Sequence, residues 1–61
     1  MTKYGSFECF PCVYNDHEGY VLFDRADGWR KIHIAEIYMT ARPITEDEFK
    51  RYGDLPPCPI E

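Results

Sequence analysis

GYVLFDRADGWRKIHI, residues 19–34, is the stretch that decides the fold. Two runs rich in β-branched and aromatic residues, 20–25 and 29–34, flank the pair Asp27-Gly28. An Asp-Gly pair between two such runs is a strong short-range hairpin signal, because glycine adopts positive φ without steric cost. The sequence therefore predicts an antiparallel hairpin that reverses at Asp27-Gly28, and the other segments are placed relative to it.

Two strand registers compete in this hairpin. A two-residue loop places Arg25 opposite Arg30, which is a like-charge pair. A three-residue loop, 26–28, places Asp24 opposite Arg30 and replaces repulsion by attraction. Cross-strand pairs of this kind differ by about 0.2–1 kcal/mol, so the three-residue loop is favoured by a small free energy.

In the favoured register both faces of the hairpin carry apolar side chains. One face carries Tyr20, Leu22, Ile32 and Ile34, and the other carries Val21, Phe23 and Trp29 beside Arg25, Lys31 and His33. A strand pair with two apolar faces needs cover on both. Small folds often wrap their termini across the second face of a sheet, so a hairpin covered on both faces is slightly favoured. The alternative is an exposed second face, and it predicts a partner-binding surface of Phe23, Arg25, Trp29 and Lys31.

The segments on either side of the hairpin predict further strands. Residues 7–14 read as a first strand, at the sheet edge or bulged near Pro11, because proline cannot donate to a ladder. After Ile34 the apolar positions change phase, which indicates a bulge or one helical turn before a short fourth strand, 36–41, ended by Pro43. A continuous helix over 32–40 is the alternative, and the isoleucines favour strand.

The clearest helix signal lies at residues 44–53. Thr45 followed by Glu48 is the pattern of a capping box, and Gly53 is the expected stop. A helix of about two turns needs packing to persist. Residues 54–61 are expected to form an extended Pro-rich tail.

Together these elements predict one small α+β domain over residues 1–61. Its fold is a small antiparallel β-sheet of three or four strands with one short C-terminal helix, and an SH3-like small barrel is the variant. A domain of this size buries only about 60% of its unfolded surface, so its stability is marginal. The expected core is Phe7, Val13, Tyr20, Leu22, Ile32, Ile34, Ile37, Phe49 and Tyr52.

Composition narrows the function classes. The net charge is −4, which disfavours non-specific binding to nucleic acid or to anionic membranes. No apolar run approaches the ~20 residues of a membrane span, and the N-terminal residues lack the apolar core of a signal peptide, so a cytoplasmic location is expected. The sequence contains no nucleophile elbow or phosphate loop, and no spacing implies a positioned general base, so we do not expect an enzyme.

Cys9-Phe10-Pro11-Cys12 is the motif of most chemical interest. Two cysteines three positions apart can chelate zinc, and the candidate ligand set is Cys9, Cys12, His17 and Cys58, with His33 as a further candidate. No second CxxC or HxxxH pair completes the pattern. Two ordinary cysteines in an edge strand are therefore favoured over a zinc staple, and no cofactor is expected.

The sequence therefore predicts a small acidic non-enzymatic module that binds a protein partner or self-associates. An inhibitor or adaptor of the kind that phages and mobile elements encode fits this size and composition. A zinc-stapled module is the first alternative. A single-stranded nucleic-acid binder is the second, because basic and aromatic residues interleave near the hairpin tip. The overall negative charge favours a protein partner over nucleic acid.

Overall fold

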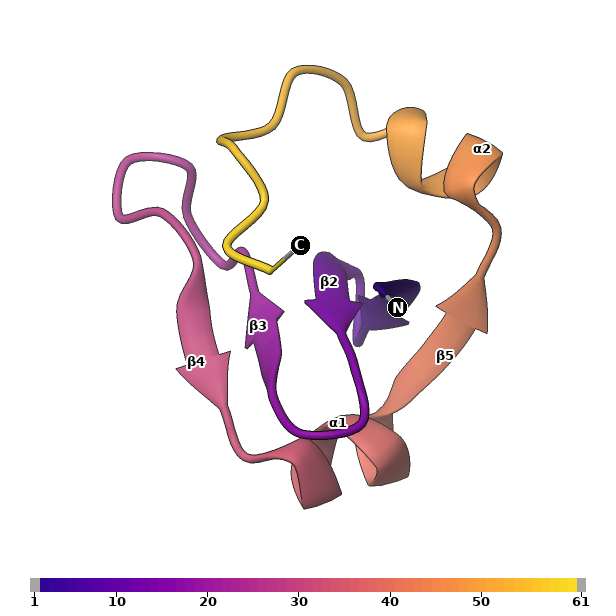
Figure 1. Ribbon diagram of the computed structural model, residues 1–61. Coiled ribbons are helices and arrows are strands. Elements are labelled where there is room, and N and C mark those ends of the chain that lie inside the picture. The colour runs from indigo at the N-terminus through magenta and orange to yellow at the C-terminus, as the bar shows by residue number, and fades with distance from the viewer. Residues whose placement is uncertain (1, 61) are drawn as a thin grey trace.

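The computed structural model describes residues 2–60, which form one five-stranded antiparallel sheet and two short helices (Figure 1). The strands are β1 (Lys3–Phe7), β2 (Phe10–Tyr14), β3 (Gly19–Val21), β4 (Arg30–Ile32) and β5 (Ala41–Ile44). Helix α1 (Ile34–Thr40) joins β4 to β5, and α2 (Glu46–Lys50) follows β5. The strand order is β4-β3-β2-β1-β5, with β4 and β5 as its two ends. The predicted α+β class is confirmed, with five strands in place of three or four.

The predicted hairpin forms with a shorter ladder. β3 pairs with β4 so that Tyr20 lies opposite Lys31 and Val21 lies opposite Arg30. Neither predicted register is correct, because pairing stops at Val21 and residues 22–29 form the connection.

Asp24 supplies the physical reason for the long connection. Its carbonyl oxygen accepts the N–H groups of Asp27 and Gly28 at 3.1 and 3.0 Å, and its carboxylate accepts the N–H of Ala26 at 2.9 Å. The N–H groups of residues 26–28 are thus satisfied within a local turn, and these donors cannot join the ladder. Gly28 has φ 78°, as the reversal requires.

The predicted strand over residues 7–14 is wrong, because the chain reverses inside it. β1 ends at Phe7, β2 begins at Phe10, and these two residues face each other across a two-residue loop. Glu8 carries the positive φ of this loop, 62°, where glycine is usual. A glutamate gives no sequence signal for such a turn.

Pro11 is not in an edge strand, because β2 lies between β1 and β3. Its carbonyl oxygen accepts the N–H of Leu22 at 3.0 Å, one residue beyond the end of β3. The proline therefore stands where the β2–β3 ladder ends, a position at which a missing donor is tolerated.

The predicted fourth strand over 36–41 is wrong, and the helical alternative is close to what forms. His33 caps α1, since its Nδ1 accepts the N–H of Ala35 at 3.1 Å. Ile37 on this helix is fully buried. Packing of Ile37 overrides the modest strand preference of the isoleucines. Pro43 lies inside β5, which is an edge strand.

The capping box at the second helix is confirmed. Thr45 Oγ1 accepts the N–H of Glu48 at 3.1 Å, and Glu48 Oε1 accepts the N–H of Thr45 at 3.1 Å. Gly53 has φ 93°, as expected for the residue that ends this segment. Helix α2 is short, and its Phe49 packs against Tyr4 with ring centroids 4.5 Å apart.

Both faces of the sheet are covered. Paired residues share a face, so the register defines an α1 face of Gly5, Phe7, Cys12, Tyr14, Gly19 and Val21, and an α2 face of Tyr4, Ser6, Val13, Tyr20, Arg42 and Ile44. Ile37 packs on the α1 face, within the buried cluster. Helix α2 and the tail cover the α2 face, where Val13 is fully buried, and Ile60 of the tail is buried too. The wrapped-terminus alternative is therefore correct, and the single-covered sheet is not.

The predicted core is confirmed in part. Phe7, Val13, Leu22 and Ile37 are buried. The other five predicted residues, Tyr20, Ile32, Ile34, Phe49 and Tyr52, are half-buried. Four residues of the buried hydrophobic core were not predicted, namely Cys12, Tyr14, Val21 and Ile60. Val21 alternates with Tyr20 along β3 and lies on the α1 face, where it is buried in the cluster that contains Ile37.

We expect Gly19→Ala to lower the free energy of unfolding by about 1–3 kcal/mol. A Cβ at Gly19 would overlap Cδ1 of the buried Ile37 and would stand 3.2 Å from its Cγ1. Ile37→Val removes Cδ1, so adding it to Gly19→Ala should restore part of the loss. Urea unfolding of the single and double variants measures this coupling. Additive losses in the double variant would contradict the contact.

Residues 2–60 include no helix with both the length and the hydrophobicity needed to cross a membrane.

Candidate functional site

Two of the four predicted partner-binding residues hold the C-terminal segment. The guanidinium of Arg25 donates to the carbonyl oxygens of Tyr52 at 2.5 Å and Asp54 at 2.9 Å. Trp29 Nε1 donates to the carbonyl oxygen of Pro56 at 3.3 Å. These side chains therefore serve the fold, which the sequence could not indicate without the position of the tail.

The structure does not gather the predicted set into one surface. Trp29 is half-buried and stacks on Phe49 with centroids 6.3 Å apart. Phe23 packs by its edge against Phe7 and Phe10, and 38% of it is exposed. Lys31 lies 3.9 Å from Glu18 in an exposed ion pair. Phe23 thus sits with residues of the α1 face, whereas Trp29 sits with those that cover the α2 face.

The predicted zinc ligands are similarly dispersed. Cys9 is exposed in the β1–β2 turn, Cys58 is exposed in the tail, and His17 is exposed in a loop. Cys12 is buried, and burial raises the pKa of its thiol to about 12. Within the described residues 2–60, no three His, Cys, Asp or Glu side chains are placed to hold a metal ion.

We expect Cys9 and Cys58 to react with a thiol reagent in the folded protein and Cys12 to react only after unfolding. The thiolate is the reactive form, and Cys12 is both inaccessible and protonated at neutral pH. Counting released thionitrobenzoate should give two thiols without denaturant and three with it. Rapid reaction of all three thiols in the native protein would contradict the burial of Cys12.

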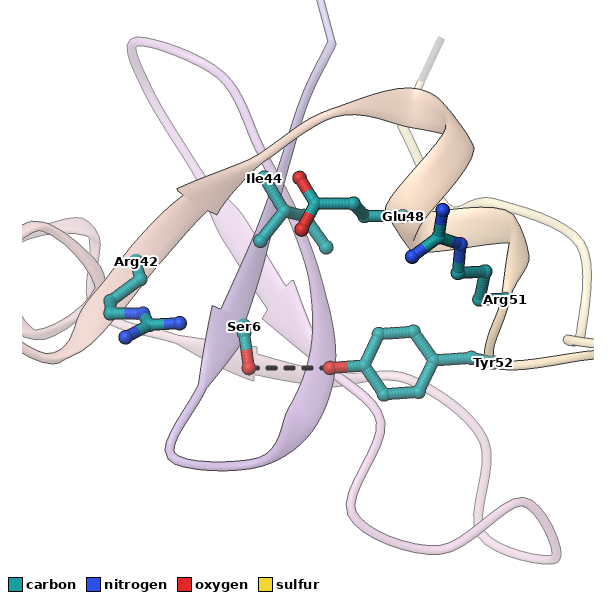
Figure 2. A pocket seen from close by; sticks show the side chains of 6 residues that line it. All are labelled: Ser6, Arg42, Ile44, Glu48, Arg51 and Tyr52. Atoms are coloured by element: carbon teal, nitrogen blue, oxygen red, sulfur yellow. Dashed lines mark hydrogen bonds between the residues drawn. The ribbon is translucent and has the colours of Figure 1, made fainter.

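A groove between the β1–β5 pair and α2 is the candidate site that combines cationic side chains with an apolar wall. It has a volume of about 270 Å³, and its lining residues are Ser6, Arg42, Ile44, Glu48, Arg51 and Tyr52. Figure 2 shows Arg42 and Arg51 at opposite ends of this groove, with both guanidinium groups directed inward. The Tyr52 hydroxyl lies 3.2 Å from Ser6 Oγ and ties the α2 segment to β1 (Figure 2).

Local sequence places each wall of the groove. Arg42 and Ile44 alternate along β5 and so point to the same face of the sheet. The capping box begins α2 directly after β5, which brings Glu48 and Arg51 above that face. Packing of the Phe49 ring against Tyr4, at an interplanar angle of 33°, then holds the helix on the sheet.

The two arginines of the groove have free donors. Both side chains are exposed, and no ion pair or hydrogen bond within the described part of the chain uses either guanidinium. Glu48, the carboxylate between them, is already engaged by Thr45 at 3.1 and 3.2 Å. The groove can therefore accept an anionic group without breaking a bond of the fold.

The sequence did not indicate that the six groove residues form a site. Glu48 was accounted for by the capping box and Tyr52 by the expected core, and neither arginine was singled out. Their convergence depends on the pairing of β1 with β5, which joins residues 4–7 to residues 41–44. No local pattern announces a pairing across that separation.

Two other depressions of the described residues differ from the groove in their chemistry. One of about 310 Å³ lies beside β4 and contains His17 and His33 with Lys31. The other, of about 430 Å³, lies near α1 and contains Met39, which is 86% exposed. Neither combines two unengaged cationic side chains with an apolar wall.

Comparisons of the chain with models of protein families, with curated proteins and with solved structures gave no match. The groove is therefore interpreted from its own chemistry.

Proposed function

We propose that this protein is a small non-enzymatic module that binds another protein, and that the groove between β5 and α2 is its docking site. The observation that supports this most is the pair of inward-directed, unengaged arginines, Arg42 and Arg51, on a chain of net charge −4. Arginine is enriched at protein–protein hot spots, where its planar donors meet acceptors of the partner.

The same charge balance argues against a nucleic-acid partner. Nucleic-acid sites gather many basic side chains along a phosphate track. Here Glu48 lies between the two arginines, and Glu46 pairs with Lys50 nearby at 3.8 Å. We propose a cytoplasmic protein as the partner. An inhibitor or adaptor role fits this use of the groove.

The SH3-like variant of the fold belongs to this proposal. β1 lies between β2 and β5, so β4 and β5 are the two ends that a closed barrel would have to bring together. We propose that the curved sheet is an SH3-like arrangement in which α1 spans the opening between these ends (Figure 1).

Affinity capture with matched variants tests the docking site. Arg42→Gln with Arg51→Gln disrupts the groove, and Arg30→Gln with Lys31→Gln is the control. Each pair removes two positive charges, and the control pair lies on β4. We expect the wild type and the control variant to retain the same partner protein from a lysate of the source cells. The amount of this protein that the groove variant retains should be lower by about tenfold or more.

Three results would contradict the proposed site. They are the absence of any specifically retained protein, equal retention by the groove variant, and loss in the control alone. A captured second copy of this chain, confirmed by light scattering and lost in the groove variant, would identify the partner as the protein itself. Circular dichroism must show that both variants remain folded.

A further inference from the structure

The charge inside the groove is small and positive. Arg42 and Arg51 contribute two positive charges and Glu48 one negative charge, which leaves a net charge of +1 among the lining residues. A single carboxylate neutralises this site, whereas a phosphate dianion would exceed it and would face Glu48 at close range. The site is thus balanced for one carboxylate.

An apolar surface lies beside the charges. Ile44 and the ring of Tyr52 line the groove between the two arginines, and both residues are half-buried (Figure 2). An apolar side chain next to the carboxylate would cover this surface. It would also lower the local dielectric around the arginines and strengthen their hydrogen bonds.

The size of the groove limits what it can hold. Its volume of about 270 Å³ lies just below the roughly 300–1,000 Å³ typical of small-molecule pockets. A groove of this volume suits one or two side chains presented by a larger partner. The arginine donors match the planar geometry of a carboxylate.

From these features we propose that the groove binds a peptide segment of the partner in which one acidic side chain, Asp or Glu, stands next to an apolar one. The carboxylate lies between Arg42 and Arg51, and the apolar side chain packs on Ile44 and Tyr52. This inference rests on the proposed function, since it names the chemistry of the segment that docks at the same site.

Nuclear magnetic resonance with short peptides tests the chemistry directly. The probes are acetyl-Leu-Asp-Leu-amide, the same peptide with Asn in place of Asp, and the same peptide with phosphoserine in that place. The side-chain Nε–Hε signals of Arg42 and Arg51 report local binding, and that of Arg30 on β4 is the internal control.

We expect the Asp peptide to shift the Arg42 and Arg51 signals in a saturable manner and to leave Arg30 unmoved. The Asn peptide should bind about fivefold to tenfold more weakly, because it lacks the charge-assisted bonds. Arg42→Gln and Arg51→Gln should each weaken the Asp peptide by a similar factor. Arg30→Gln should not.

Several outcomes would overturn the inference. No saturable shift, equal binding of the Asn peptide, or tighter binding of the phosphoserine peptide would each exclude a site built for one carboxylate. If capture of a partner protein still depends on Arg42 and Arg51 in that case, the proposed docking site stands and only its chemistry is wrong. If the Asp peptide binds but no protein capture depends on the groove, the proposed function is wrong instead.

Discussion

Replacing Ile37 by alanine is expected to lower the free energy of unfolding by about 3 kcal/mol. Ile37 is 1% exposed, and it is the residue through which α1 enters the buried cluster of the α1 face. The glycine at position 19 gives the Ile37 side chain room, because Cδ1 lies too close to this glycine for a Cβ to fit. Truncation to alanine removes this contact and leaves a cavity.

For a domain of 61 residues this loss is severe. Total stability of about 0.05–0.15 kcal/mol per residue corresponds to roughly 3–9 kcal/mol, so the variant should lose a third or more of its stability. Urea unfolding followed by far-ultraviolet circular dichroism measures the change. Met39→Ala is the matched control, since Met39 lies on the same helix and is 86% exposed, and its effect should stay within about 0.5 kcal/mol. Equal midpoints for the two variants would mean that α1 does not pack through Ile37.

The elements whose signals are local were predicted well. The reversal at Asp27-Gly28 and the capping box at Thr45 depend on residues within three positions of each other, and both form. The hairpin register was wrong because Asp24 draws the backbone into its own turn. The backbone N–H groups can join either this turn or the strand ladder, and strand propensity does not decide between the two.

Other elements could not be predicted because their determinants are tertiary or atypical. Glu8 has a positive φ, a conformation that Gly, Asn and Asp adopt much more often than Glu. His33 serves as an N-cap, where Ser, Thr, Asp or Asn is usual. Helix α1 carries two isoleucines in residues 34–40, and burial of Ile37 stabilises it there.

The candidate site shows the same division. Arg25 and Trp29 were predicted to contact a partner protein, and within the described residues they donate hydrogen bonds to carbonyl oxygens of the C-terminal segment. The groove depends on two long-range placements, namely β5 beside β1 and α2 above them. A tail of prolines and few apolar residues gives little indication of where it will lie.

Trp29→Ala is expected to lower the free energy of unfolding by about 2–3 kcal/mol. The sequence alone suggests instead that this substitution would weaken only the binding of a partner. Truncation of a buried tryptophan costs about 3–5 kcal/mol, and half-burial reduces this figure. The variant loses stacking on Phe49 and the hydrogen bond to the Pro56 carbonyl. Detachment of the tail should then expose Ile60 and the α2 face.

Two further variants, Trp29→Phe and Phe23→Ala, provide comparisons for the loss expected in Trp29→Ala. Trp29→Phe keeps an aromatic ring against Phe49 and removes the N–H donor, so a loss of about 1 kcal/mol is expected. Phe23→Ala, on the more exposed ring beside Phe7 and Phe10, should also cost about 1 kcal/mol. Urea midpoints followed by circular dichroism order the three variants, because tryptophan fluorescence is lost with the only tryptophan of the chain. An unchanged midpoint for Trp29→Ala together with loss of the captured partner would instead place the docking surface at Trp29 and remove the case for the groove.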